Sequence, residues 1–135
     1  MAAHKLYNAS VTINSVDLSD HCKSVTINQG AESLDNTVMS NTTRSHLGGL
    51  FTWSIDIEFE QDYASSSIDQ TLNALVGATT TFIIKSDAGT TTATNPKWTG
   101  TGLVTSYQPV GGTVGDLHLT KLHLDSASVL TRGTS

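Results

Sequence analysis

The segment from Phe51 to Asp62 alternates between apolar and polar side chains with a period of two. Its odd positions from 51 to 59 are all apolar, and its last four even positions are the acids Asp56, Glu58, Glu60 and Asp62. A β-strand turns successive side chains to opposite faces, so this pattern predicts a strand with one apolar face and one acidic face. The acidic face needs a physical explanation, because same-face carboxylates about 6.6 Å apart repel one another mildly through water.

Three explanations of this acidic stripe start from the residues alone. A metal site would need carboxylates that converge, whereas alternate residues of one strand point in parallel. Asp56 and Glu58 have a spacing compatible with the paired acids of a glycosidase, but any acidic strand meets that test and an aromatic sugar platform is lacking. The third explanation is a solvated face balanced by bases on a neighbouring strand, such as Lys85 or Lys121.

Composition favours one β-rich domain spanning residues 1–135. Only 14% of the residues are charged, and threonine, which suits strands, is abundant. Twelve acids against seven bases give a net charge of −5, the opposite of the balance expected for a protein that grips nucleic-acid phosphates. No apolar run approaches the roughly 20 residues needed to cross a membrane, and Met1 to Leu6 lacks the apolar core of a signal peptide. We therefore expect a cytoplasmic site of synthesis and no membrane partner.

Further strands are expected at residues 9–14, 24–28, 79–85, 97–107, 114–124 and 128–132. Asn14-Ser15 resembles a tight hairpin turn, although glycine is preferred at its second position. Gly100 and Gly102 indicate bending or close backbone approach. The apolar parity of the last long strand changes, which predicts a β-bulge near Thr120 and Lys121.

One helix is expected at about residues 66–76. Ser67 to Gln70 fits a capping box, and Gly77 suits the C-terminal end. A long loop is expected at about 29–49 and a polar loop at about 86–96, because neither range shows sustained periodicity. The fold class that follows is mainly β, an antiparallel β-sandwich or barrel of about seven or eight strands flanked by one α-helix.

No arrangement of residues predicts catalysis, a metal site or a cofactor. A single cysteine, Cys22, excludes an internal disulfide, and adjacent strand residues face opposite ways, so His21 is poorly placed to activate it. The glycine pairs 48–49 and 111–112 read as turns, because neither lies at a strand-to-helix junction with a lysine. Arg44, in the long loop, fits a subunit contact or a solvated position equally well. The protein is therefore expected to be a building block rather than an enzyme.

Several segments together resemble the major tail tube proteins of long-tailed (siphovirus-type) bacteriophages. Residues 11–21 read Val-Thr-Ile-Asn-Ser-Val-Asp-Leu-Ser-Asp-His, which is similar to the opening hairpin of that family, except that Ser15 replaces its usual glycine. The other similar segments are residues 43–50, 59–64, 68–72, 95–100 and 109–117. Each motif is mostly a turn, but their order and spacing together cover most of the chain.

The resemblance implies a β-sandwich with one flanking helix, in which six copies form a ring whose inner sheets join into a continuous barrel. Stacked rings would form the phage tail tube, assembled in the host cytoplasm, with the same chain and other phage tail proteins as partners. DNA would pass through as cargo without being specifically bound. Asp56, Glu58, Glu60 and Asp62 would then line the lumen, since a negative wall repels the phosphate backbone.

The long loop occupies the place from which the family commonly reaches a neighbouring ring. Asp35, Asn41, Arg44 and His46 are its candidate contacts between subunits or rings. Two alternatives remain open at this point. One is a phage head decoration or head–tail joining protein, and the other is a carbohydrate-binding or host-attachment β-sandwich, for which Trp98 with Tyr107 is the candidate aromatic pair.

Overall fold

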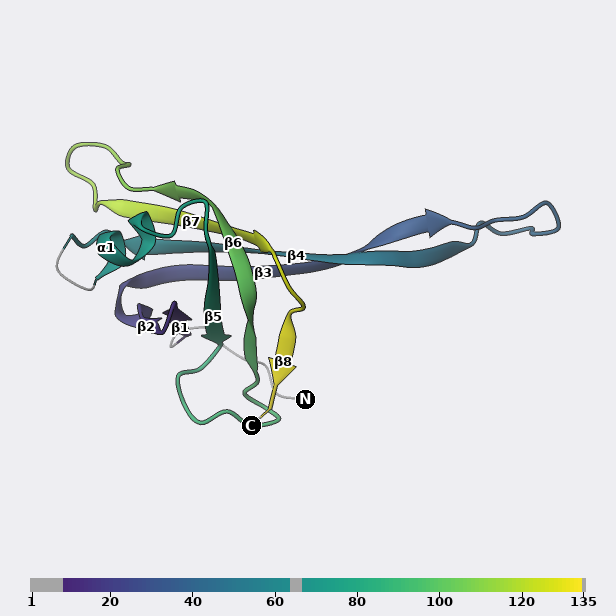
Figure 1. Cartoon of the computed structure of the whole chain (residues 1–135), viewed down its shortest axis with the longest axis horizontal. Coiled ribbons are helices and arrows are strands. Elements are labelled where there is room, and N and C mark those ends of the chain that lie inside the picture. The colour runs from purple at the N-terminus through teal and green to yellow at the C-terminus, as the bar shows by residue number, and fades with distance from the viewer. Residues whose placement is uncertain (1–8, 64–66, 135) are drawn as a thin grey trace.

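Eight antiparallel strands and one short helix make up residues 9–63 and 67–134, the part of the chain that the computed structural model describes (Figure 1). The strands are β1 (Ser10–Ile13), β2 (Val16–Asp17), β3 (Cys22–Asp35), β4 (His46–Glu60), β5 (Thr79–Lys85), β6 (Lys97–Gln108), β7 (Leu119–Ser126) and β8 (Thr131–Gly133). A 3-10 turn, η1 (Ser19–His21), precedes β3, and the helix α1 (Ile68–Asn73) follows β4. The predicted fold class, mainly β and antiparallel with one helix, is confirmed.

The strands form a single sheet in the order β2-β1-β5-β6-β7-β4-β3, and β8 adds to β6. The long strand β6 pairs with β5 through its first half and with β7 through its second half. The backbone passes very close to its neighbours there, since a Cβ on Gly102 would lie 3.3 Å from Leu124. The two halves of the sheet pack on each other like a sandwich, and the rings of Trp53 and Phe82 meet edge to face with centroids 5.3 Å apart.

The core lies between these two halves. Along β4 the odd positions from Trp53 to Phe59 are buried, as the alternation predicts. Each such side chain contributes roughly 1.5–3 kcal/mol on burial. The other buried apolar side chains come from β1, α1, β5, β6, β7 and the residue after β2: Val11, Ile13, Leu18, Ile68, Leu72, Phe82, Ile84, Val104, Leu122 and Leu124.

Helix α1 closes one end of the sandwich (Figure 1). Ile68 and Leu72 anchor it through full burial. It is shorter than expected, because turns follow it as far as Gly77, whose φ is +83°. Residue 66 of the expected helix lies outside the described residues. Ser67 is the N-cap, but the predicted capping box is wrong, since its hydroxyl accepts no hydrogen bond from the helix backbone and donates to Asp62 Oδ2 at 2.8 Å.

Strands β3 and β4 pair far beyond the sandwich and form a projecting hairpin (Figure 1). Their ladder runs from Cys22 opposite Phe59 to Asp35 opposite His46. The expectation of an unpaired loop is therefore wrong for residues 29–35 and 46–49, and only residues 36–45 lie outside the two strands. The sequence gives no periodicity there because neither face of the hairpin is buried. We call residues 29–52 the hairpin arm. The polar loop at 86–96 lies between β5 and β6 and contains one isolated bridge, Thr92 to Asn95.

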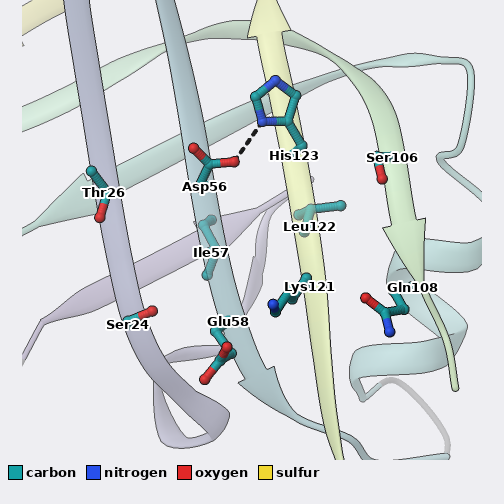
Figure 2. A pocket seen from close by; sticks show the side chains of 10 residues that line it. All are labelled: Ser24, Thr26, Asp56, Ile57, Glu58, Ser106, Gln108, Lys121, Leu122 and His123. Atoms are coloured by element: carbon teal, nitrogen blue, oxygen red, sulfur yellow. Dashed lines mark hydrogen bonds and ion pairs between the residues drawn. The ribbon is translucent and has the colours of Figure 1, made fainter. Parts of the chain in front are cut away.

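The predicted bulge near Thr120 and Lys121 is wrong. Strand β7 begins only at Leu119, so Leu117 belongs to the preceding loop. Within the strand the buried side is Thr120, Leu122 and Leu124, and Leu119 lies on the other side. The pairing of β7 with β4 has no register shift. The irregularity lies instead on β6, between Val104 and Ser106. This bulge lets Ser106 and Gln108 share the outer face of the sheet with β7 and β4 (Figure 2).

Candidate assembly surfaces

Four neighbouring strands, β3, β4, β7 and β6, present a polar outer surface, which we call the polar face (Figure 2). It exists because strand alternation sends the apolar side chains of β4 and β7 into the core and their polar side chains outward. Its residues are Ser24, Thr26, Ser54, Asp56, Glu58, Glu60, Ser106, Gln108, Lys121, His123 and Asp125. Helix α1 packs into the core side of the sheet through Ile68 and Leu72 and leaves Asp56 58% exposed.

Two bases on β7 lie opposite two acids on β4. The register pairs Asp56 with His123 and Glu58 with Lys121. His123 Nδ1 lies 2.5 Å from Asp56 Oδ1, and its Nε2 lies 3.0 Å from Asp125 Oδ1. The hydrogen bond with Asp56 is the main cause of a raised pKa at His123. Part of the acidic stripe is thus balanced by bases, as the solvated-face explanation requires. Lys121 supplies one of these bases.

Lys85, the other base considered, belongs to the other half of the sheet. It lies on β5, opposite Ser10 of β1 and Lys97 of β6. Its ammonium group donates to the carbonyl of Gly89 at 2.7 Å.

Asp62 is separated from the other three acids of the stripe. It follows the end of β4, and its Oδ2 lies 3.1 Å from His21 Nε2 besides accepting the Ser67 hydroxyl. Its backbone carbonyl accepts the amide of Asp69 in α1. His21 also has its Nδ1 2.9 Å from Asp20, and this hydrogen bond is the main cause of its raised pKa. The structure therefore brings Asp56, Glu58 and Glu60 together and assigns Asp62 to the junction with the helix.

The four candidate contact residues of the expected loop gather at the tip of the hairpin arm. Asp35 and His46 are cross-strand partners at the last rung of the ladder. Arg44 Nη1 donates to Asp35 Oδ2 at 3.1 Å, and the amide of Asn41 closes a turn onto Val38. The side chain and the amide of Thr37 lower the pKa of the Asp35 carboxyl group, and the amide donates to Asp35 Oδ1 at 2.9 Å.

The hairpin arm also carries large apolar side chains that sequence reasoning did not single out. They are Leu34, Val38, Met39, Leu47, Leu50 and Phe51, all exposed. Phe51 was grouped with the core side of β4, but it is 85% exposed whereas Trp53 is only 6% exposed. The strand has passed the end of the opposing layer between these two residues. Exposed apolar side chains gathered on one projection indicate a protein contact surface.

The end of the molecule opposite the hairpin arm is apolar as well. The connection between β6 and β7 exposes Val110, Val114 and Leu117, and Tyr63 is exposed beside it, with its hydroxyl donating to the Pro109 carbonyl. Figure 1 shows this connection and the arm at opposite ends of the long axis. The two ends therefore offer two different surfaces for contact with other protein.

Strand β3 leaves a long sheet edge open. It pairs with β4 on one side, and within residues 9–63 and 67–134 no strand pairs with its other side. The edge spans the 14 residues Cys22–Asp35. An open edge of this length is a template for pairing with a strand of another chain.

Chemistry-bearing clusters are lacking in the part of the chain that the structure describes. No group of three or more His, Cys, Asp or Glu residues there could hold a metal ion. Burial raises the pKa of the Cys22 thiol to about 11, which makes it a poor nucleophile. Trp98 and Tyr107 are nine positions apart on β6, roughly 30 Å along a strand. Tyr107 donates its hydroxyl to Asp69, whereas Trp98 lies 6.0 Å from the Arg132 guanidinium, so the pair forms no sugar platform.

This fold is found in subunits of tail-like and virion particles. A chain of the virion of a native gene transfer agent particle matches with a TM-score of 0.77 and 19% identity, over 96% of this chain and 98% of that one. A chain in the tail of an empty gene transfer agent particle with C6 symmetry matches with a TM-score of 0.69 and 21% identity, over 85% and 83%. A chain of the six-fold symmetrised baseplate of the anti-feeding prophage matches with a TM-score of 0.57 and 12% identity, over 98% and 97%.

No protein-family model and no curated protein matches the chain. The likeness to the solved structures covers nearly the full length of both chains, and at these identities it establishes the fold. No helix among residues 9–63 and 67–134 is long and apolar enough to cross a membrane.

Proposed function

We propose that this protein is the tail tube subunit of a phage or phage-like particle, in which rings of six copies stack around a DNA conduit. The observation that carries this proposal is the full-length likeness to chains of a virion and of a C6-symmetric tail. The open edges and exposed apolar ends of the chain support it, because they are surfaces that an assembled state would cover. Its partners are other copies of itself and other tail proteins of the virion.

Ring closure would use the open sheet edges. The exposed edge of β3 would pair with a strand of the next copy, so that the polar faces join into one continuous barrel wall. Asp56, Glu58 and Glu60 would then be repeated around the bore, and a negative wall repels the phosphates of passing DNA. The net charge of −5 is consistent with DNA as cargo rather than as a bound ligand.

Stacking would use the two ends of the long axis. The hairpin arm would reach the adjacent ring and bury its exposed apolar side chains there. An interface that joins two different surfaces of the same chain propagates along an axis rather than closing a pair. This geometry suits a tube of variable length.

Negative-stain electron microscopy of the purified protein over a range of concentrations tests the proposal. Tubes of uniform bore built from stacked rings are the expected result. Single rings that never extend would instead support the head–tail joining or decoration alternative, or a ring like that of the six-fold baseplate. Monomers at every concentration, with or without tail-tip proteins to nucleate assembly, would contradict the tube.

The placement of the polar face in the lumen has its own test. Glu58→Cys in a Cys22→Ser background would react with a small maleimide in assembled tubes but not with one coupled to a protein too large for the bore. Thr81→Cys, on an exposed position of β5, is the matched control and should react with both reagents. Equal labelling of Glu58→Cys by both reagents would place the polar face on the outside.

A further inference from the structure

His123 lies between two carboxylates from different strands. Asp56 of β4 contacts its Nδ1 at 2.5 Å (Figure 2). Asp125 of β7 contacts its Nε2 at 3.0 Å. An ionised carboxylate only accepts hydrogen bonds, whereas a neutral imidazole carries one N–H and one lone pair. A neutral ring would therefore point a lone pair at one of the two carboxylates. Only the protonated ring, with two N–H groups, satisfies both contacts.

The charged groups around His123 determine how its protonation changes the net charge of the polar face. Besides Asp56 and Asp125, the charged groups on this face are Glu58 and Glu60 of β4 and Lys121 of β7. Strands β3 and β6 contribute uncharged side chains here, Ser24, Thr26, Ser106 and Gln108. Four carboxylates therefore face two cations when the ring is protonated and one when it is not, so the net charge changes from −2 to −3.

We propose that His123 is a proton-operated control of ring assembly, an inference that rests on the proposed tube function. With its proton held between Asp56 and Asp125, the imidazole of His123 limits the negative charge of the polar faces that adjoining copies must bring together. Loss of the proton changes the charge of each polar face from −2 to −3, which is half as large again. Because repulsion between like-charged faces grows with the product of their charges, the repulsion between adjoining polar faces roughly doubles.

The direction of the pH response follows from the contacts. The hydrogen bond with Asp56 first, and that with Asp125, raise the pKa of His123 above its ordinary value, and burial opposes them only partly. The ring thus stays protonated at and somewhat above the ordinary titration range of histidine, near pH 6.5. Assembly is favoured on the protonated side and weakens as the pH rises through the raised pKa.

Nitrogen NMR of the unassembled protein tests the protonation state without any tube. Both ring nitrogens of His123 should still carry protons at pH 6.5, and the midpoint of titration should fall in Asp56→Asn and in Asp125→Asn. Glu32→Gln, which removes a charge on the hairpin arm, is the matched control and should leave the midpoint unchanged. One unprotonated nitrogen at pH 6.5 with no response of the midpoint to Asp56→Asn would overturn the proposal.

Tube yield against pH, followed by light scattering and microscopy, tests the assembly step. The parent protein should lose tubes as the pH rises through the midpoint found by NMR. His123→Arg, with a permanent charge, should keep its tubes, and His123→Gln should behave at every pH like the parent at high pH. Identical pH profiles for the parent and His123→Arg would overturn the control role. If no variant forms tubes at any pH, the proposed function fails and the assembly role fails with it, whereas the NMR result still decides the protonation state.

Discussion

His21 and Asp62 join three elements of the body through a few atoms. His21 ends η1, Asp62 follows β4, and Ser67 precedes α1, with all three linked through the Asp62 carboxylate. Asp20 holds the second nitrogen of the His21 ring. Both nitrogens face carboxylates, so the folded protein favours the protonated ring and its pKa is raised. A residue that belongs by alternation to an acidic stripe thus serves to fix a helix.

This contact makes stability depend on pH in a definite direction. Since the folded state raises the pKa of His21, its contribution is complete below about pH 6.5 and is lost as the pH rises through the folded value. His21→Gln should therefore cost a few tenths to about 1 kcal/mol at pH 6, as for partly exposed pairs, and less at pH 9. Urea unfolding of both proteins at the two pH values measures this. A larger cost at pH 9 than at pH 6 would contradict it.

The turn between β1 and β2 holds a serine in an unfavourable backbone conformation. Asn14 has φ of +52° and Ser15 has φ of +67°, which is the two-residue hairpin turn that the sequence predicted. The left-handed region costs an ordinary residue roughly 1–2 kcal/mol but is open to glycine. Ser15→Gly should therefore stabilise the protein by about 0.5–1 kcal/mol, part of the gain being offset by the freedom of glycine in the unfolded chain.

Thermal unfolding of Ser15→Gly and of the matched control Ser15→Ala checks this turn. The alanine variant keeps the strained φ and should not become more stable than the parent. A lower melting temperature for Ser15→Gly than for Ser15→Ala would contradict the turn geometry.

At the scale of elements, the hairpin arm differs from every other part of the sheet. Its residues are nearly all exposed, so backbone pairing holds it together without a core. An isolated two-stranded ribbon is at best marginally stable in water. The hairpin arm therefore contributes little to the stability of its own subunit. Its exposed apolar side chains would be buried only by contact with another chain.

Shortening the hairpin arm separates its folding role from its assembly role. Because Asp35 and His46 are cross-strand partners, residues 36–45 can be replaced by a two-residue Asn-Gly turn. The shortened protein should unfold within about 0.5 kcal/mol of the parent, since no core side chain changes. It should form far fewer tubes or none, as measured by sedimentation and microscopy. Normal tube yield would show that the tip makes no essential contact.

At the scale of the whole molecule, the folded chain presents different surfaces at the two ends of its long axis. The hairpin arm lies at one end of the long axis and the apolar connection of Val110, Val114 and Leu117 lies at the other (Figure 1). Contacts between two different ends of identical chains extend indefinitely unless something stops them. The asymmetry of one subunit therefore becomes the polarity of the assembly.

This polarity predicts that a subunit with one damaged end blocks growth. The shortened-arm protein keeps its opposite end, so adding it to the parent protein should give shorter tubes as its fraction rises. Tube lengths measured by microscopy at several mixing ratios check this, with Ser15→Gly as a control that leaves both ends intact. Unchanged tube lengths at high fractions of the shortened protein would mean that it does not assemble together with the parent protein.

Most of what could be predicted about the fold came from the alternation of apolar and polar residues along the strands. The buried positions 53 to 59 of β4, the antiparallel strands and the positive-φ turn at Asn14 and Ser15 all follow from local rules, and the structure has each of them. The wrong predictions concern segments in which no buried face imposes a regular pattern on the sequence. The hairpin arm lacks a buried face and so shows no period. The expected bulge on β7 came from Leu117, which lies in a loop, and from Leu119, which is the first residue of the strand.

The sequence by itself determined which side of β4 is apolar and which is acidic, because side-chain direction along a strand depends only on position. Tertiary structure decided which partners those acids have. It placed His123 and Lys121 opposite Asp56 and Glu58, and it turned Asp62 toward His21 and α1. It also left Phe51 exposed two residues from the buried Trp53, because the opposing layer ends between them. Strand register and the extent of the covering layer are long-range properties, set by packing between segments far apart in the chain.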